Sequence, residues 1–141
     1  MPNSFQALLE ILDAPSRKTL EAACLNITLA AGQVIYEQGD PADAVYIVTA
    51  GVVEAVTFSP DGKQSRTVSR MLEGDFFGEL AVFTDEARLA SVRTCAASVV
   101  LRIGKDDFLR LMSTIPKLGL FFSKTLARRL HHTSTEAHHQ G

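Results

Sequence analysis

The most informative part of this chain is a pair of neighbouring stretches, GDFFGELA at residues 74–81 and RLASV at residues 88–92. They place one carboxylate, Glu79, and one guanidinium, Arg88, about a loop's width apart, beside a glycine that can open a short helix. Backbone N–H groups at a helix start attract anions, and an arginine opposite them can donate to two oxygens of a phosphate. Glu79 repels phosphate and is better suited to accept hydrogen bonds from neutral hydroxyls. The pair therefore indicates a ligand that carries a phosphate and a free sugar hydroxyl, such as a nucleotide.

The region around these stretches is rich in short β runs. Between residues 27 and 103, Gly and Asp separate such runs at fairly regular intervals. The expected strands span residues 34–37, 45–49, 52–58, 66–71, 90–94 and 98–103. Pro60 and Gly62 lie where a tight hairpin turn can use them. No long helical stretch interrupts this region, which disfavours parallel crossover units and predicts an antiparallel β-roll.

Helical patterns flank the β-rich region on both sides. An apolar stripe predicts an amphipathic helix at residues 4–12, and a second helix is expected after Ser16, through Ala23. Beyond the β-rich region, helices are expected at residues 106–112 and from Pro116 onward. The last helix has apolar residues at four-residue spacing, namely Leu118, Phe122, Leu126 and Leu130. The chain is therefore expected to be an α+β protein, mainly β, with an antiparallel β-roll of the jelly-roll type between terminal helices.

This organisation divides the chain into four segments. Residues 1–26 are the N-terminal helical segment, residues 27–104 the roll, residues 105–132 the C-terminal helices and residues 133–141 a polar, flexible tail. The size of the chain, 141 residues, fits one domain with its own core.

Composition limits the class of function. The formal net charge is −2 and the isoelectric point is near 6.1, so no overall positive field would attract nucleic acid or an anionic membrane. The longest apolar stretches are far shorter than the roughly 20 residues that span a bilayer, and no secretory signal is visible at the N-terminus. These features predict a cytoplasmic protein without direct nucleic-acid or membrane binding.

Cysteine and histidine give no indication of a metal or catalytic site. The cysteines, Cys24 and Cys95, are too few and too far apart for a disulfide framework or a four-cysteine site, and buried free thiols are expected. All four histidines lie at or after His131, as two adjacent pairs whose members point to different helix faces, so a solvated tail is favoured over a metal site. No Ser-His-Asp arrangement is apparent, and the sequence predicts neither catalysis, nor a metal, nor a cofactor.

The stretch AGQVIYEQGD at residues 31–40 adds a second pattern, in which glycines occupy positions where β runs must reverse. Together with GELA at residues 78–81 and the following arginine, it resembles the cyclic nucleotide-binding domain family, which includes the regulatory subunits of cyclic-AMP-dependent protein kinase and the bacterial catabolite activator protein. The resemblance covers about residues 29–130. The glycine turns of residues 31–40 are expected to be structural, without ligand chemistry of their own.

The resemblance implies a phosphate-binding cassette at residues 74–92. The spacing of nine residues from Glu79 to Arg88 is that of kinase regulatory subunits. It implies that Arg88 pairs with the exocyclic phosphate oxygens, that Glu79 accepts the ribose 2'-hydroxyl, and that backbone groups complete the cradle at Gly78, Leu80, Ala81, Leu89 and Ala90. An ordinary surface ion pair between Glu79 and Arg88, worth roughly 0 to 1 kcal/mol, is the simpler alternative. The combination of the flanking residues with the nine-residue interval favours ligand binding.

Two positions depart from the family pattern. Ala87 stands where the family often has proline before the arginine, so the backbone of this loop is less restricted in conformation. Leu89 stands where Ala, Ser or Thr is usual, and a hydroxyl at that position tends to accompany guanine recognition. Because leucine has no hydroxyl, the expected ligand is cyclic AMP in preference to cyclic GMP.

The C-terminal helix is the expected output element. In the family it closes over the base or carries a dimer contact, so Leu126, Arg128, Arg129 or Leu130 could form a lid, and a homodimer could form through this helix. The leading hypothesis is a regulatory sensor that signals through the helix to an unidentified output protein or domain. The alternatives are the effector domain of a transcription factor without its helix-turn-helix, and an interaction module that has lost its ligand; a haem or oxygen sensor is disfavoured by the lack of histidine in the roll.

Overall fold

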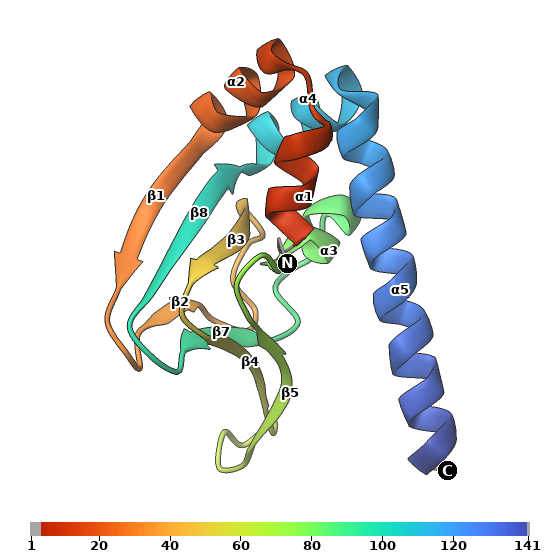
Figure 1. The fold of residues 1–141 in the computed structure, drawn as a ribbon. Coiled ribbons are helices and arrows are strands. Elements are labelled where there is room, and N and C mark those ends of the chain that lie inside the picture. Colours follow the sequence, from red (N-terminus) through yellow and green to blue (C-terminus); the bar gives the residue numbers. More distant parts are fainter. Residues whose placement is uncertain (1–3, 141) are drawn as a thin grey trace.

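The protein is a β-roll with helices at one end and along one side (Figure 1). The computed structural model describes the backbone of residues 4–140 and the side chains of residues 5–129. In this part of the chain the strands are β1 (Cys24–Leu29), β2 (Val34–Tyr36), β3 (Ala44–Ala50), β4 (Val53–Phe58), β5 (Ser65–Met71), β6 (Phe76–Phe77), β7 (Ser91–Thr94) and β8 (Ser98–Gly104). They form two four-stranded sheets of order β1-β8-β3-β6 and β2-β7-β4-β5, with every pairing antiparallel. The predicted fold class is confirmed.

The helices surround one end of this roll. They are α1 (Ser4–Ile11), α2 (Ala14–Ala23), α3 (Glu79–Thr84), α4 (Lys105–Thr114) and α5 (Pro116–Gln140). In Figure 1, α2 and α4 lie at the top of the roll, and α5 descends along its right side with α3 between them. This arrangement places the GELA stretch between the roll and the last helix.

Several element boundaries differ from the sequence expectation. Helix α2 begins at Ala14, earlier than predicted, because the Asp13 side chain caps it by accepting a hydrogen bond from the Ser16 N–H at 2.7 Å. Strand β1 begins at Cys24, before the predicted start of the roll at residue 27, because Cys24 already pairs with Ile103 of β8. The helix α5 continues to Gln140, beyond the predicted end at residue 132. Flexibility of residues 133–141 stays a prediction.

Two hydrophobic clusters fill the interior. The first joins the helices to the outer face of the β1-containing sheet and is centred on Phe76, Phe108 and Phe122. The second lies inside the roll and includes Tyr46 and Phe77. Because Phe76 and Phe77 are adjacent on β6, their side chains point to opposite faces and join the two clusters. The cassette that follows β6 is thereby attached to both cores.

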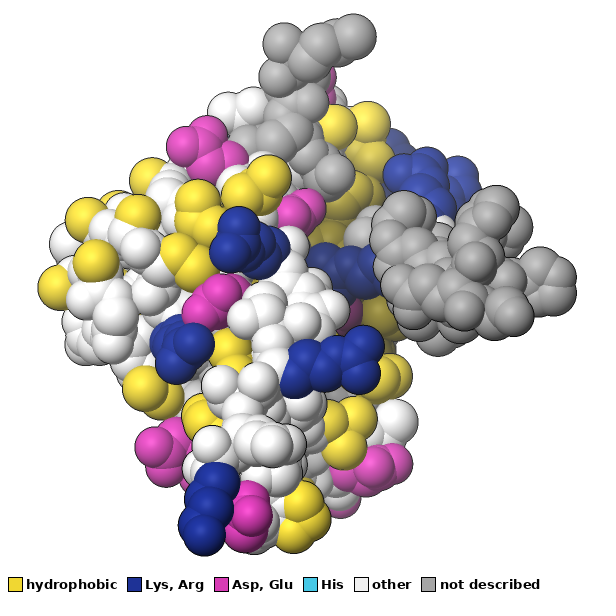
Figure 2. Space-filling model, turned by 90° about the horizontal axis from the view of Figure 1, so that it is seen from below, with side chains coloured by type: hydrophobic (Ala, Val, Ile, Leu, Met, Phe, Trp, Pro, Cys, Tyr) yellow, Lys and Arg dark blue, Asp and Glu magenta, His cyan; other side chains and the backbone are white. Residues whose placement is uncertain are grey.

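The two cysteines differ in exposure, and the surface charges shown in Figure 2 are mixed in sign. Both cysteines are free, but the prediction of burial is wrong for Cys95, which is exposed in the turn between β7 and β8, while Cys24 is partly buried. Figure 2 shows basic and acidic side chains interspersed on the face that it presents, without a field of one sign. Within the described residues, no helix combines the length and the apolar character needed to cross a membrane.

Candidate functional site

A cavity of about 600 Å³ opens between the cassette, the β5 wall of the roll and α5. Its lining includes all seven residues that the sequence singles out as a nucleotide site: Gly78, Glu79, Leu80, Ala81, Arg88, Leu89 and Ala90. A cavity of this size lies in the range typical of sites for small organic ligands. The residues of the cassette, which lie close together in the sequence, therefore line one concave surface.

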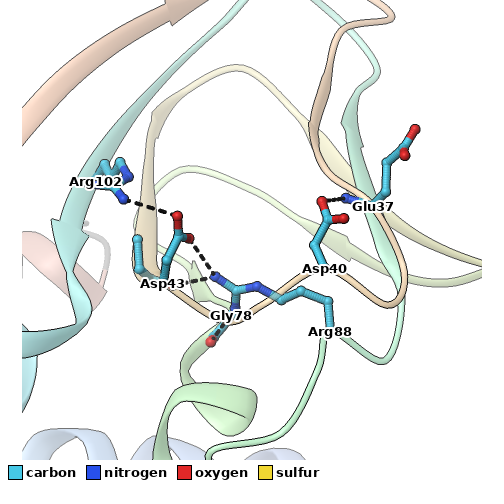
Figure 3. A network of polar contacts seen from close by, with 7 residues as sticks. Glu37, Asp40, Asp43, Gly78, Arg88 and Arg102 are labelled. Carbon is cyan, nitrogen blue, oxygen red and sulfur yellow. Dashed lines mark hydrogen bonds and ion pairs between the residues drawn. The ribbon is translucent and has the colours of Figure 1, made fainter.

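Arg88 is buried in the wall of this cavity, with only 3% of its surface exposed. Its Nη1 donates to the Gly78 carbonyl oxygen at 2.6 Å and its Nη2 to the Ala44 carbonyl oxygen at 2.5 Å. Its Cζ lies 4.0 Å from the centre of the Tyr36 ring, a cation–π contact. Figure 3 shows the guanidinium reaching from its loop into the space between Gly78 and Asp43. Three separate segments thus hold one guanidinium.

The backbone of Arg88 is anchored as firmly as its side chain. Its N–H donates to the Asp40 carbonyl at 2.8 Å, and its carbonyl accepts from the Gly39 N–H at 2.8 Å. The Asp40 carboxylate closes this turn by accepting from the Glu37 N–H at 2.9 Å, as Figure 3 shows. The QGD stretch expected to be purely structural therefore also positions Arg88.

The charge of Arg88 is not cancelled by a close carboxylate. Among the described residues, the carboxylate in ion-pair contact with it is that of Asp43, whose Oδ1 lies 3.9 Å from Nη2. The Asp43 side chain is 68% exposed and also contacts Arg102. The bonds at 2.5 and 2.6 Å instead go to neutral carbonyl oxygens. Among the described side chains, the Nε of Arg88 is the buried polar atom without a hydrogen-bond partner. A buried cation with an unsatisfied donor is suited to an anionic ligand.

Gly78 is required at the start of α3 for two reasons. Its φ of +83° lies in the left-handed region that side chains rarely adopt. A Cβ at this position would lie 2.7 Å from the Nη1 of Arg88. Glycine therefore provides both the turn between β6 and α3 and the room for the guanidinium.

Glu79, the first residue of α3, is 3% exposed and is contacted from α5. The Nη1 of Arg129 donates to its Oε1 at 2.5 Å, while the Nη2 of Arg129 donates to the Phe76 carbonyl. Burial raises the pKa of the Glu79 carboxyl, and the guanidiniums of Arg129 and Arg88 oppose that shift. The carboxylate therefore faces the cavity as a buried acceptor that one cation from α5 partly neutralises.

The four predicted lid residues have different positions in the structure. Arg129 lines the cavity, whereas Arg128 is exposed and Leu126 is partly buried, and neither of these two is part of the lining. The side chain of Leu130 lies outside the described side chains. Covering of a base by any of the four stays a prediction.

The sequence did not identify the part of the cavity lining that comes from β2 and β5. Val68, Ser69 and Arg70 of β5 and Tyr36 of β2 also line the cavity. The β runs that contain them were expected, but their place at the site depends on how the strands pair. Tyr36 pairs with Val92 of β7, and β5 reaches the cavity through its pairing with β4. A strand pattern in the sequence does not reveal such partners.

Metal chemistry has no support in the described part of the chain, where no group of three or more His, Cys, Asp or Glu residues could hold an ion. The tail histidines lie outside the described side chains. The polar side chains that line the cavity are those of Arg70, Arg88, Arg129, Asp75, Glu79, Ser69 and Tyr36.

Comparisons with known proteins agree with this geometry. Residues 26–115 match the family model described as "Cyclic nucleotide-binding domain". A cAMP-dependent protein kinase regulatory subunit of Emericella nidulans is 35% identical over 111 residues, which is 79% of this chain and 26% of that protein. The chain thus spans about a quarter of the length of this relative.

Two solved structures resemble the whole fold. The catabolite activator protein of Thermus thermophilus superposes with a TM-score of 0.80 at 26% identity, over 92% of this chain and 61% of that one. The regulatory domain of Toxoplasma gondii PKA, solved with cAMP, gives a TM-score of 0.73 at 29% identity, over 88% of this chain and 46% of that one.

Proposed function

The chain belongs to the cyclic nucleotide-binding domain family, and we propose that it is a regulatory sensor that binds cyclic AMP in preference to cyclic GMP and signals through α5. The observation that carries this proposal is the state of Arg88. It is a buried cation, held by neutral carbonyls, whose Nε has no partner in the described structure. A cyclic phosphodiester has one negative charge, so one arginine together with backbone amides balances it without a metal.

The ribose supports the same assignment. The Glu79 carboxylate lines the same cavity. When it is ionised it has no proton to donate, so a ligand group that binds it must be a hydrogen-bond donor. A sugar hydroxyl provides such a donor, and a phosphate does not. We therefore assign the phosphate to Arg88 and the ribose 2'-hydroxyl to Glu79, with Gly78, Leu80, Ala81, Leu89 and Ala90 around them.

The preference for adenine rests on Leu89. This side chain is 63% exposed, lines the cavity and has no hydroxyl to offer to a purine. One observation favours cyclic GMP as a second candidate. Arg70 also lines the cavity, and guanine presents two acceptors, O6 and N7, that match a guanidinium. The Leu89→Thr variant separates the two, since on our assignment the new hydroxyl should shift the ratio of affinities toward cyclic GMP by about fivefold.

Signalling through α5 is supported by direct contacts between the cassette and the helices. Arg129 binds Glu79 and lies over the Phe76 ring, with its Cζ 4.7 Å from the ring centre. Phe76 in turn contacts Phe122 of α5, with ring centres 4.2 Å apart. A nucleotide that engages Glu79 would change the partner of Arg129 and so favour a different position of α5.

We propose that α5 passes the signal to a partner protein, to a further domain or to a second copy of the chain, and that the domain itself is not catalytic. An effector domain of a transcription factor and an interaction module without ligand are the alternative functions. Failure of the isolated protein to bind either nucleotide would support the interaction module.

Calorimetric titration with cyclic AMP and cyclic GMP tests the proposal. The wild-type protein should bind cyclic AMP more tightly, and Arg88→Ala should weaken binding by about 2 to 5 kcal/mol, roughly 30-fold to a few thousandfold. Arg110→Ala is the matched control, because Arg110 is exposed and pairs with Asp107 away from the cavity. Unchanged affinity in Arg88→Ala would refute the site.

Amide exchange tests the signal separately. Binding of cyclic AMP should change the protection of residues 117–132, and identical exchange with and without nucleotide would refute signalling through α5 while leaving the binding site intact.

A further inference from the structure

Tyr36 is in cation–π contact with the buried guanidinium. It ends β2, packs against Tyr46 and Phe77 with ring centres 5.9 and 6.2 Å away, and presents its ring face to Arg88. A guanidinium stacked on an aromatic face loses rotational freedom and keeps its charge. The ring therefore forms a rigid support for Arg88 inside the roll.

The Tyr36 hydroxyl is placed beside the same group. A Cβ added to Gly78 would lie 3.4 Å from the Tyr36 Oη and 2.7 Å from the Arg88 Nη1, so both atoms border the space that glycine leaves open. The cavity lining includes all three residues. Within the described part of the chain, no hydrogen bond is made by this hydroxyl, whereas a partly buried phenol normally has one.

Two donors without acceptors thus belong to residues that line the same cavity. The Arg88 Nε is buried and unpartnered, and the Tyr36 hydroxyl borders the space beside Gly78. Burial raises the pKa of Tyr36 to about 12, so the phenol is a neutral donor at physiological pH. An anion with several acceptor oxygens in one small group would satisfy both donors.

We propose that Tyr36 binds and positions the phosphate: its ring face fixes the Arg88 guanidinium, and its hydroxyl donates to an exocyclic oxygen of the bound cyclic nucleotide. This inference rests on the proposed function and adds a side-chain donor outside the cassette. It gives β2 a direct role in ligand binding, where the sequence indicated only a structural one.

The test compares Tyr36→Phe, which removes only the hydroxyl, with Tyr36→Leu, which also removes the ring face. Tyr46→Phe is the matched control, because Tyr46 belongs to the same aromatic cluster and does not line the cavity. Affinities are measured by calorimetry for cyclic AMP and for its two phosphorothioate diastereomers, each of which replaces one exocyclic oxygen by sulfur.

We expect Tyr36→Phe to weaken cyclic AMP binding about tenfold or more, since the acceptor is charged. Tyr36→Leu should weaken it by a further two- to fivefold through loss of the cation–π contact. Sulfur is a poor acceptor, so the effect of Tyr36→Phe should shrink for one diastereomer and persist for the other. Tyr46→Phe should bind as the wild type does.

Three results would overturn the inference alone: wild-type affinity in Tyr36→Phe, equal losses in Tyr36→Phe and Tyr46→Phe, or equal effects of Tyr36→Phe on cyclic AMP and on both diastereomers. A wild-type protein that binds neither cyclic nucleotide would overturn the proposed function and this inference together. Because Tyr36→Phe preserves the packing of the ring, its result is decisive even if Tyr36→Leu does not fold.

Discussion

The two ends of the cavity hold their charged groups in different ways. Arg88 is fixed within the roll by the Gly78 and Ala44 carbonyls and by the turn at residues 39 and 40. Glu79 is contacted from outside the roll by Arg129, whose side chain is 38% exposed and belongs to the last helix. The Arg88 end of the cavity is therefore pre-organised, whereas the contact at the Glu79 end comes from a partly exposed side chain of another element.

On the proposed function, this difference suggests that Arg88 mainly provides binding affinity and that the contact between Glu79 and Arg129 mainly provides the signal. A group whose position is set before binding loses little conformational entropy when the ligand arrives. On the proposed function, a ligand that engages Glu79 would replace the contact from α5, and that replacement would favour a different position of the helix.

Substitution at Gly78 should disrupt the pre-organised end. In Gly78→Ala the positive φ costs about 1 to 3 kcal/mol of stability, and the new Cβ displaces Arg88, so nucleotide affinity should fall about tenfold or more. Urea unfolding and calorimetry measure the two effects. Gly62→Ala is the control, because Gly62 also has a positive φ, of +73°, but no atom within 4 Å of the added Cβ. It should lose stability without losing affinity, and equal affinities of the two variants would show that Arg88 is not held tightly.

Removal of the Arg129 charge should weaken the contact between α5 and Glu79 and lower the stability of the protein. Arg129→Met keeps the side-chain volume and leaves the buried Glu79 carboxylate without this donor. We expect the free energy of unfolding to fall by about 1.5 kcal/mol, the low end for a bond to a charged group because Arg129 is partly exposed. Arg128→Met, at an exposed neighbouring position, should change little. Equal stability of the two variants in urea unfolding would contradict the contact.

The pH dependence of stability reports the same carboxylate. Burial raises the pKa of Glu79 in the folded protein above its ordinary value of 4.5, so the folded state binds the proton more tightly than the unfolded chain does. The stabilisation that Glu79 contributes is therefore fully present below pH 4.5 and is lost as the pH rises through the raised pKa of the folded protein. The free energy of unfolding falls by up to about 1.4 kcal/mol for each unit by which the folded-state pKa exceeds the unfolded one.

Glu79→Gln should abolish this pH-dependent component, and Arg129→Met should enlarge it, because Arg129 opposes the shift. Urea unfolding at a series of pH values from 4 to 8 measures it. A Glu79→Gln profile parallel to that of the wild type would show that Glu79 does not titrate abnormally.

The smallest effect is expected at Asp43. Although this carboxylate approaches Arg88, it lies 3.9 Å away and is largely exposed, so solvent screens the pair. Asp43→Asn should change stability by less than about 0.5 kcal/mol and nucleotide affinity by less than about twofold. A larger loss of affinity by calorimetry would show that a carboxylate, and not the neutral carbonyls, orients Arg88.

Local patterns in the sequence predicted most of the roll and the core of the site. The turn around Pro60 and Gly62 joins β4 to β5 as expected, and Gly78, Glu79 and Arg88 meet because few residues separate them. The start of β1 at Cys24 was not predicted, because it depends on pairing with β8. The exposure of Cys95 was not predicted, because it depends on the position of the turn between β7 and β8. Tyr36 and Arg70 were missed as lining residues because their place at the cavity also depends on how the strands pair.

A carboxylate and a guanidinium in one loop of a β-roll could be read from the amino-acid sequence alone, since spacing and turn chemistry act over a few residues. The burial of Arg88 against Ala44 and Tyr36, and the contact of Arg129 of α5 with Glu79, follow from the tertiary structure. Desolvation and hydrogen-bond partners depend on residues far away in the chain, which are brought together by strand pairing and helix packing. The charges at the site were therefore visible in the sequence, but what holds them was not.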